Sequence, residues 1–476
     1  MDFKTGLSFD DILLTPERTE VSPKSVDTST RITESIVLDK PLISSPMDRV
    51  TESEMAISMA VNGGLGIIHR NMSTEEQVEE VKKVKESQSW IIKNPETISP
   101  DSTVKEAEQR MEEKSISGLP VVENGKLKGI LTSRDLRFEN NLEKAVNEAM
   151  TERVVKSDPD TTMEEAKSIL HKNKIEKLPL VEEDNKLYGL ITIKDIEKNE
   201  KHPEATLDEK GRLMVGAAIG PGQWQRLESL VNAGIDLAVV DTSHGNSEEV
   251  INYIEEINES FDVCIMAGNV ATEDGARNLA EAGADSIRVG IGPGSICTTR
   301  IVSGVGVPQV TATIEAAKGS PEDVSVVTDG GIRYSGDIAK SIACGADAAM
   351  LGNLLAGTDE SPGRVVFREG RKYKEYRGMG SEGAMRENAE SRYKEKGDKG
   401  KVPEGVEGLV PYKGKVSEVL HQLTGGVRSS MGHLGAKTIK EMKNANIQKI
   451  TKAGKRESHP HNVDVMSETP RYSGEE

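Results

Sequence analysis

Cysteine and aromatic residues are both scarce in this chain of 476 residues. Only three cysteines occur, far apart, and aromatic residues make up 3% of the chain. Three scattered cysteines offer no disulfide framework and are typical of a protein from a reducing cytoplasm. Metal-binding spacings such as CxxC and HExxH are absent from the sequence. So few aromatic side chains are a poor basis for a surface that stacks nucleic-acid bases.

Basic residues are fewer than acidic ones, and the sequence has no long apolar run. The 79 acidic residues outnumber the 61 basic ones, and the net charge of −18 argues against nucleic acid or an anionic membrane as a partner. No apolar segment approaches the ~18 residues that a membrane-spanning helix needs. The N-terminus lacks the apolar region of a signal peptide. We therefore expect a cytoplasmic protein that binds neither nucleic acid nor membrane.

What the sequence does contain is a regular alternation of strand-like and helix-like segments. Several helical segments end in glycine, as in Ala233-Gly and Cys344-Gly, which is a common way to end a helix. Alternation predicts a parallel sheet, and eight units predict a closed (β/α)8 barrel (the TIM barrel) rather than an open doubly wound sheet. The eight strand-like runs are residues 42–47, 65–69, 214–220, 237–243, 263–270, 286–292, 325–331 and 348–353.

A segment inserted between the second and third strands contains an internal repeat. Residues 117–135 match residues 176–195, and each copy follows a Thr-x-x-Glu-Ala helix start. The copies, at about 92–145 and 146–200, resemble CBS motifs, and the pair resembles a Bateman module. That resemblance implies an adenine or guanine nucleotide with Asp135 and Asp195 on its ribose. An insert that only mediates assembly is the alternative. The catalytic barrel would comprise residues 1–91 and 202–476.

Small and polar side chains follow the predicted strands, at the end of the barrel where ligands bind. Cys297 lies among glycines and hydroxyls directly after an apolar run, where a thiol can attack a bound substrate. The turns at Asp329 and Gly352 follow the last two strands, where backbone N–H groups often hold phosphate. The Asp329 carboxylate could accept hydrogen bonds from a ribose diol, or cap a helix. In contrast, Cys264 and Cys344 are predicted to be core residues.

No GxGxxG fingerprint links a strand to a helix in this sequence. A dinucleotide would therefore have to bind on the barrel face rather than in a Rossmann crevice.

Six motifs, in the same order, resemble those of the IMP dehydrogenase family, and the resemblance covers nearly the whole chain. It implies an oxidoreductase that converts IMP to XMP and reduces NAD+, in guanine nucleotide biosynthesis. The reaction would pass through a covalent cysteine thioimidate that water hydrolyses. The motifs are SSPMD at 44–48, GGLGIIHRN at 63–71, GPGSICTT at 292–299, DGGIR at 329–333, YRGMG at 376–380 and SRY at 391–393.

The resemblance also implies a role for each member of a set of residues. Cys297 would attack C2 of the purine, and Arg392 would act as general base in hydrolysis, with Thr299 and Tyr393 assisting. The NAD+ contacts would be Asp241, Ser243, Asn269 and Arg288. The contacts to the phosphate and ribose of IMP would be Ser45, Ser295, Asp329, Gly331, Gly352, Asn353 and Tyr376. The contacts to its base would be Met47, Met379, Gly380 and Glu404, and Gly378 would be a further substrate contact.

The resemblance further implies a K+ ion and an oligomer. Main-chain carbonyls of Gly292, Gly294 and Cys297 would hold the ion, because such oxygens suit a hard cation of low charge. Glu457, Ser458 and His459 of a neighbouring subunit would complete the site. A homotetramer is expected, and an octamer stays open. Residues from about 381 to 416 would form a mobile flap.

Two positions depart from the pattern of the family, and one related activity competes with the dehydrogenase. Arg49 stands where the family usually has threonine, and Asn353 where it often has serine. GMP reductase, which converts GMP to IMP with NADPH, has the same barrel and a similar cysteine loop. The SRY segment and residues 402–408 favour the dehydrogenase. A catalytically silent nucleotide sensor is disfavoured by the presence of Cys297, Thr299 and Arg392 together.

Overall fold

The chain forms two compact units, each described here by itself. The computed structural model describes residues 3–87, 91–137, 139–200, 202–391 and 402–462, so that the predicted Arg392 and Tyr393 lie outside the described residues. The first unit comprises Met1–Ser87, Glu204–Asp208 and Leu213–Glu476, and the second comprises Gln88–Pro203 and Glu209–Arg212.

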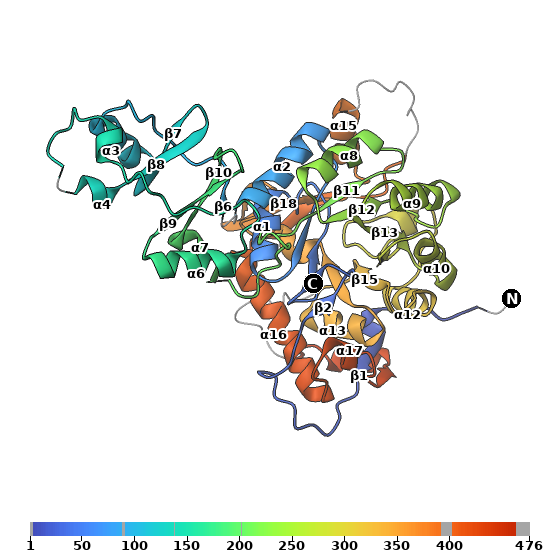
Figure 1. The fold of residues 1–476 in the computed structure, drawn as a ribbon. Coiled ribbons are helices and arrows are strands. Elements are labelled where there is room, and N and C mark those ends of the chain that lie inside the picture. Colours follow the sequence, from blue (N-terminus) through green and yellow to red (C-terminus); the bar gives the residue numbers. More distant parts are fainter. Residues whose placement is uncertain (1–2, 88–90, 138, 201, 392–401, 463–476) are drawn as a thin grey trace. The chain divides into compact units, whose positions relative to one another are not determined.

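The first unit contains a closed barrel of eight parallel strands, which confirms the predicted fold class and excludes the open sheet (Figure 1). All eight predicted runs contain a barrel strand. The order around the barrel is β11 (Gly216–Ile219), β12 (Leu237–Asp241), β13 (Cys264–Val270), β14 (Ser286–Val289), β15 (Ser325–Asp329), β16 (Ala348–Leu351), β4 (Leu42–Ser44) and β5 (Leu65–Ile68).

The barrel strands are apolar on both faces because both faces are buried. Ile67 belongs to the cluster inside the barrel, whereas its neighbour Ile68 packs in the cluster shared with the outer helices. Successive residues of a strand alternate between its two faces, which explains this division. The helices around the barrel are α1 (Ser53–Val61), α2 (Thr74–Ser87), α8 (Trp224–Ala233), α9 (Glu248–Ser260), α10 (Glu273–Glu281), α12 (Gln309–Gly319), α13 (Ser335–Ala343), α14 (Asn353–Ala356) and α16 (Val416–Leu434).

A three-stranded antiparallel sheet follows the barrel in the sequence. Its strands are β17 (Val365–Arg368), β18 (Arg371–Arg377) and β19 (Glu407–Pro411). The predicted flap at 381–416 therefore contains β19, as well as the helix α15 (Glu382–Ser391). The sequence of this segment shows no strand period, and β19 forms because it pairs with β18 in register, Tyr376 opposite Gly408.

Short elements complete the first unit. They are η1 (Phe9–Asp11), α11 (Thr299–Val302), α17 (Ile439–Met442) and α18 (Lys452–Glu457), with the pairs β1 (Ile12–Leu14) with β20 (Ile447–Lys449) and β2 (Thr30–Arg31) with β3 (Val37–Leu38). Among the described residues, no helix has the length and apolarity needed to span a membrane.

The second unit repeats one order of elements, helix, strand, strand, helix. Thr103 and Thr162 each begin the first helix of a copy with a capping box, as the Thr-x-x-Glu-Ala pattern predicts. The CBS assignment itself stays a prediction. The first copy contains α3 (Val104–Glu113), β7 (Gly118–Glu123), β8 (Lys126–Thr132) and α4 (Ser133–Leu136), and the second contains α6 (Met163–Asn173), β9 (Lys177–Val181), β10 (Leu187–Thr192) and α7 (Ile193–Glu200), with β6 (Ile91–Ile92) and α5 (Val146–Ala149) in addition.

Candidate active site

The loop that carries Cys297 leaves β14 and packs on the end of β15. A Cβ atom added to Gly290 would lie 2.2 Å from the carbonyl oxygen of Asp329, so only glycine allows this approach. The loop then turns back on itself, and the backbone N–H of Cys297 donates to the carbonyl of Gly294 at 3.1 Å. These contacts place the half-buried thiol at the carboxyl end of the barrel.

A chain of hydrogen bonds leads from the Cys297 thiol to a carboxylate. The thiol donates to Oγ1 of Thr299 at 3.2 Å, and the Thr299 hydroxyl donates to Oε2 of Glu404 at 2.8 Å. Backbone bonds fix this approach, because Thr298 N–H donates to the carbonyl of Glu404 and Val406 N–H donates to that of Ile296. The arrangement provides a path along which the thiol proton can leave. Sequence reasoning assigned Glu404 to the substrate base and missed this chain.

A buried guanidinium connects three strand ends. Arg288 on β14 is 7% exposed, and its Nε and Nη1 bond to Asp329 at 2.9 Å and to Asp241 at 2.7 Å. Burial acts to lower the pKa of Arg288, but the two carboxylates raise it above its usual value. Burial acts to raise the pKa of Asp241, but Arg288 and Arg70 hold it below its usual value. Both groups therefore stay charged at neutral pH.

Asn269 joins the same network through its amide nitrogen, but its amide oxygen makes no hydrogen bond within the described residues. Its amide N–H2 donates to Oδ2 of Asp329 at 2.9 Å and to the carbonyl of Gly290 at 2.8 Å. Its Oδ1 is buried without a hydrogen-bond partner among the described residues. The structure thus brings together three of the four predicted NAD+ contacts, whereas Ser243 lies exposed on the loop after β12.

Several of the predicted IMP contacts converge on Gly352. A Cβ atom there would lie 2.9 Å from Oη of Tyr376, 3.2 Å from Sδ of Met47 and 3.9 Å from Cβ of Ser45. Asn353 directly follows Gly352 and is the first residue of the short helix α14. Burial raises the pKa of Tyr376, although a hydrogen bond with Ser295 acts to lower it, and the hydroxyl stays protonated.

The neighbouring turn after β15 lies against the cysteine loop. A Cβ atom on Gly330 would lie 3.2 Å from the backbone nitrogen of Gly294, and one on Gly331 would lie 3.5 Å from Cβ of Pro293. The predicted phosphate turn and the cysteine loop are therefore in direct contact, as a substrate that spans both would require.

An ion pair missed by sequence reasoning supports the predicted base contacts. Arg377 donates from Nε to Oδ2 of Asp48 at 2.9 Å, and both side chains are less than a tenth exposed. Asn71 donates to the same oxygen at 2.8 Å. The backbone N–H of Asp48 faces Sδ of Met379 at 3.4 Å. Arg49, which departs from the family pattern, directly follows Asp48 and is half-buried.

Two further predicted IMP contacts, Gly378 and Gly380, lie next to this ion pair in the sequence. Gly380 accepts from the backbone N–H of Glu404 at 2.9 Å, and Gly378 donates to Val406 at 3.0 Å. The end of β18 and the start of β19 thus lie next to the cysteine loop. In the sequence, only the positions of these residues in the motifs indicated this proximity.

The predicted cation ligands lie in two places within this one chain. Gly292 lies in the cysteine loop beside the side chain of Arg300, and a Cβ atom there would be 2.7 Å from Arg300 Cγ. Glu457 ends α18, Ser458 follows it, and the ring of His459 lies 6.1 Å from that of Tyr334. Because the site as predicted needs a second subunit, the cation stays a prediction. Among the described residues, no cluster of histidine, cysteine and carboxylate side chains is placed to hold a metal ion.

Asp135 and Asp195, the predicted nucleotide contacts of the second unit, each occupy a helix start. Oδ2 of Asp135 accepts from the backbone N–H of Thr132 at 2.8 Å and from its hydroxyl at 2.6 Å. Asp195 accepts from the hydroxyl of Thr192 at 2.6 Å. Capping alone accounts for this residue type at both positions, so the nucleotide role stays a prediction.

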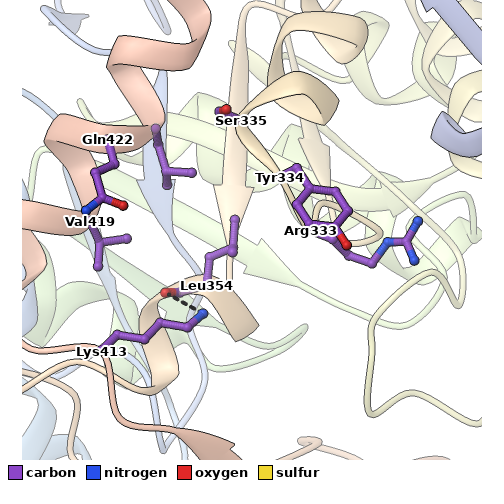
Figure 2. A pocket seen from close by; sticks show the side chains of 8 residues that line it. Arg333, Tyr334, Ser335, Leu354, Lys413, Val419 and Gln422 are labelled. Atoms are coloured by element: carbon purple, nitrogen blue, oxygen red, sulfur yellow. Dashed lines mark hydrogen bonds between the residues drawn. The ribbon is translucent and has the colours of Figure 1, made fainter. Parts of the chain in front are cut away.

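Leu354 of α14 also lines a small cavity. Figure 2 shows Lys413 and Leu354 beside it, with a hydrogen bond of 3.4 Å from the Lys413 ammonium to the Leu354 carbonyl. Gln422 also lines it, and its buried Oε1 has no partner among the described residues. Burial lowers the pKa of Lys413 to about 8. The remaining lining residues are Arg333, Tyr334, Ser335, Val419 and Leu423.

Comparison with known proteins agrees with this geometry. A family model described as the IMP dehydrogenase / GMP reductase domain matches residues 6–461. The chain belongs to the IMP dehydrogenase / GMP reductase family. The resemblance read from the six motifs is thereby confirmed.

Members of the family match this chain from end to end. It is 54% identical to the inosine-5'-monophosphate dehydrogenase of Aquifex aeolicus (strain VF5), over 98% of either chain. It is 50% identical to that of Bacillus subtilis (strain 168), over 99% of this chain and 98% of the relative. A crystal structure of a GMP reductase variant from Trypanosoma brucei in complex with guanosine 5'-monophosphate is 40% identical, with a TM-score of 0.86 over 97% of this chain and 99% of that one.

Proposed function

We propose that this chain oxidises IMP to XMP and passes the hydride to NAD+, as an IMP dehydrogenase. The observation that carries the proposal is the hydrogen-bonded chain from the Cys297 thiol through Thr299 to Glu404. The loop that carries Cys297, where this series of hydrogen bonds begins, touches the proposed phosphate turn. Relatives named as IMP dehydrogenases, about half identical over almost the full length, support this reading over GMP reductase.

In the proposed first step, the sulfur of Cys297 forms a bond to C2 of the purine. The thiol proton leaves through the Thr299 hydroxyl to the Glu404 carboxylate, and the hydride on C2 leaves with its electron pair. NAD+, when bound, supplies the acceptor for that hydride. Covalent attachment divides one difficult substitution into two easier steps, because the sulfur first activates C2 and later departs.

In the proposed second step, water adds to C2 of the cysteine adduct and the carbon–sulfur bond breaks. The products are XMP and a free thiol, which regains a proton. Arg392, with Tyr393 and Thr299, is proposed to take the proton from that water. An arginine base requires surroundings that reduce the cost of losing its proton. The flap at 381–416, which carries Arg392, is proposed to bring this side chain to the adduct.

The remaining IMP contacts are proposed to anchor the nucleotide across the barrel mouth. The Arg288 and Asn269 bonds occupy Oδ2 of Asp329, and the other oxygen of this carboxylate is proposed to accept the ribose hydroxyls. The phosphate is proposed to lie at the turns of Gly331 and Gly352, where backbone N–H groups can hold an anion.

The dinucleotide is proposed to bind beside Asp241, Asn269 and Arg288. Buried polar atoms are normally hydrogen-bonded, and Oδ1 of Asn269 is a buried acceptor that has no donor among the described residues. An N–H or O–H group of the dinucleotide fits this need. The K+ ion at the cysteine loop, the homotetramer or octamer that completes its site, and a nucleotide at Asp135 and Asp195 belong to the same proposal.

The test is an assay of NADH formation with IMP, NAD+ and K+. The wild type is expected to form NADH, and Cys297→Ala is expected to lose this activity. Cys264→Ala is the matched control, because its sulfur contacts the Ser35 hydroxyl at the opposite end of β13 from the proposed site. NADPH consumption with GMP, in place of NADH formation with IMP, would assign the chain to GMP reductase instead.

A second experiment tests the proposed base. Arg392→Ala is expected to retain hydride transfer and to slow hydrolysis, so the cysteine adduct should accumulate and become visible by mass spectrometry. Equal slowing of the two steps would contradict the role proposed for Arg392.

A further inference from the structure

The side chain of Lys374, on β18, points into a cage of main-chain carbonyls. Its ammonium group donates to Thr358 at 2.8 Å, to Asp359 at 3.2 Å and to Ser361. The residue is only 3% exposed. An ammonium carries three N–H donors, and each of the three has a carbonyl here. A charged lysine thus occupies a cradle of the type that a monovalent cation would fill.

The caged turn, residues 357–361, follows α14 directly. Its other bonds tie it to the segment after β19, because Lys413 N–H donates to the Gly357 carbonyl at 2.8 Å and Tyr412 donates to Asp359 at 2.6 Å. The Lys413 ammonium adds the contact with Leu354 within α14 (Figure 2). The C-terminal end of this one-turn helix is therefore held by cations and by β-type pairing.

Strand β18 also reaches the opposite end of α14. Tyr376 follows Lys374 by two residues, so both side chains lie on the same face of the strand. The Tyr376 hydroxyl lies against Gly352, which immediately precedes α14. One strand thus holds the turn after α14 through Lys374 and meets the proposed phosphate turn through Tyr376.

We propose that Lys374 is a positioning residue that sets Gly352, Asn353 and Tyr376 in place for the substrate phosphate. This inference rests on the proposed function, because it concerns the nucleotide at that site. Without the ammonium, the carbonyls of Asp359 and Ser361 lose this donor, while the carbonyl of Thr358 keeps the Ser361 hydroxyl at 3.0 Å. An acceptor left without a donor is unfavourable, so the turn is expected to move to reach water. Movement of the turn displaces α14 and with it the backbone N–H groups that would bind the phosphate.

The first test replaces the ammonium with a side chain of similar length, Lys374→Met. The matched control is Lys372→Met, because Lys372 lies on the same face of β18 but is exposed, with its ammonium 5.2 Å from the ring centre of Tyr412. Lys374→Met is expected to raise KM for IMP about tenfold or more, which corresponds to about 1.4 kcal/mol, with kcat nearly unchanged. The control is expected to match the wild type.

Chemical rescue separates positioning from general damage. Lys374→Ala leaves space for a small amine, and n-propylammonium at saturating K+ is expected to restore much of the lost IMP affinity. The wild type and Lys372→Met should not respond to the amine. Lys374→Arg, which keeps the charge, serves if the neutral variants fail to fold, and it is expected to keep KM closer to the wild-type value than the neutral variants do.

A rise in the thermal unfolding temperature on addition of IMP reports binding without turnover. The wild type is expected to show this rise and Lys374→Met to show much less of it. The inference would be overturned if Lys372→Met changed kcat and KM as much as Lys374→Met does. An unchanged KM in Lys374→Met would also overturn it, as would a folded Lys374→Ala that the amine does not rescue. A wild type that binds IMP but forms no NADH would contradict the proposed function. The shift in unfolding temperature would still test the role of Lys374 in that case.

Discussion

At the scale of single residues, the proposed exit of the Cys297 thiol proton depends on Thr299. Its hydroxyl is the only link that the described bonds provide between the sulfur and the Glu404 carboxylate. Thr299→Val keeps the shape and removes the hydroxyl. We expect IMP-dependent NADH formation to fall by about 10²-fold, the lower end of the usual contribution from positioned proton transfer.

The control for Thr299 is its neighbour in the sequence. Thr298→Val removes a hydroxyl at the start of α11 that makes no capping bond, while its backbone contact with Glu404 stays. Rapid-mixing measurement of the first turnover compares the two variants. A first turnover in Thr299→Val as fast as in Thr298→Val would contradict the proposed proton path.

Lys413 makes the pH dependence of stability testable at the same scale. Its pKa is about 8 in the folded protein, lowered by burial, against about 10.4 in an unfolded chain. Between these values the unfolded chain binds more protons, so the lysine destabilises the fold fully below pH 8 and progressively less as the pH rises toward 10.4.

Lys413→Met should therefore stabilise the protein at neutral pH, by on the order of 1–2 kcal/mol, and this gain should shrink at higher pH. Chemical unfolding of variant and wild type at neutral and alkaline pH measures the difference. Lys415→Met, at an exposed position just before α16, is the control and should show no such trend. A difference that stays constant with pH would show that Lys413 is not titrating in this range.

At the scale of elements, α14 connects the proposed phosphate turn to the small sheet of β17, β18 and β19. The backbone of Gly352 has φ −106°, so alanine meets no conformational strain there. A methyl group would, however, lie 2.9 Å from the Tyr376 hydroxyl and 3.2 Å from Sδ of Met47. We expect Gly352→Ala to raise KM for IMP about tenfold through displacement of α14 or Tyr376.

Gly336→Ala provides the comparison for Gly352→Ala, because a methyl group there would contact nothing within 4 Å. Steady-state kinetics and thermal unfolding of both variants separate loss of affinity from loss of stability. An unchanged KM in Gly352→Ala would place the substrate away from this turn.

The elements also show what the sequence could reveal. The strands β11 to β16 were predictable because apolar runs, polar turns and helical patterns alternate with regular spacing. The cysteine loop and the turn at Asp329 followed from their places after strands. The Arg377–Asp48 ion pair was not predictable, because it joins residues far apart in the chain and each lies inside a motif with another apparent role. Pairing of β18 with β19 was missed for the same reason.

At the scale of the whole molecule, the inserted unit interrupts the chain without interrupting the barrel. Strands β5 and β11, which flank the insertion in the sequence, pair directly, with Ile67 opposite Gly216. The second unit has hydrophobic clusters of its own. A protein in which a short Gly/Ser linker replaces residues 92–200 should therefore keep most of its IMP-dependent NADH formation.

The control for the shortened protein is its thermal unfolding with and without IMP. A rise in unfolding temperature equal to that of the full chain would show that the barrel site is intact. A shortened protein that folds and binds IMP but forms no NADH would mean that the second unit takes part in the reaction.

During turnover, the sulfur of Cys297 is proposed to bond covalently to the purine. Rapid quenching with acid after mixing the protein with IMP and NAD+, followed by peptide mapping, tests it most directly. The claim predicts a peptide that contains Cys297 and carries the mass of the nucleotide, and its absence from Cys297→Ala. A catalytically active wild type with no such peptide under conditions that trap Arg392→Ala, or an active Cys297→Ala, would contradict the claim.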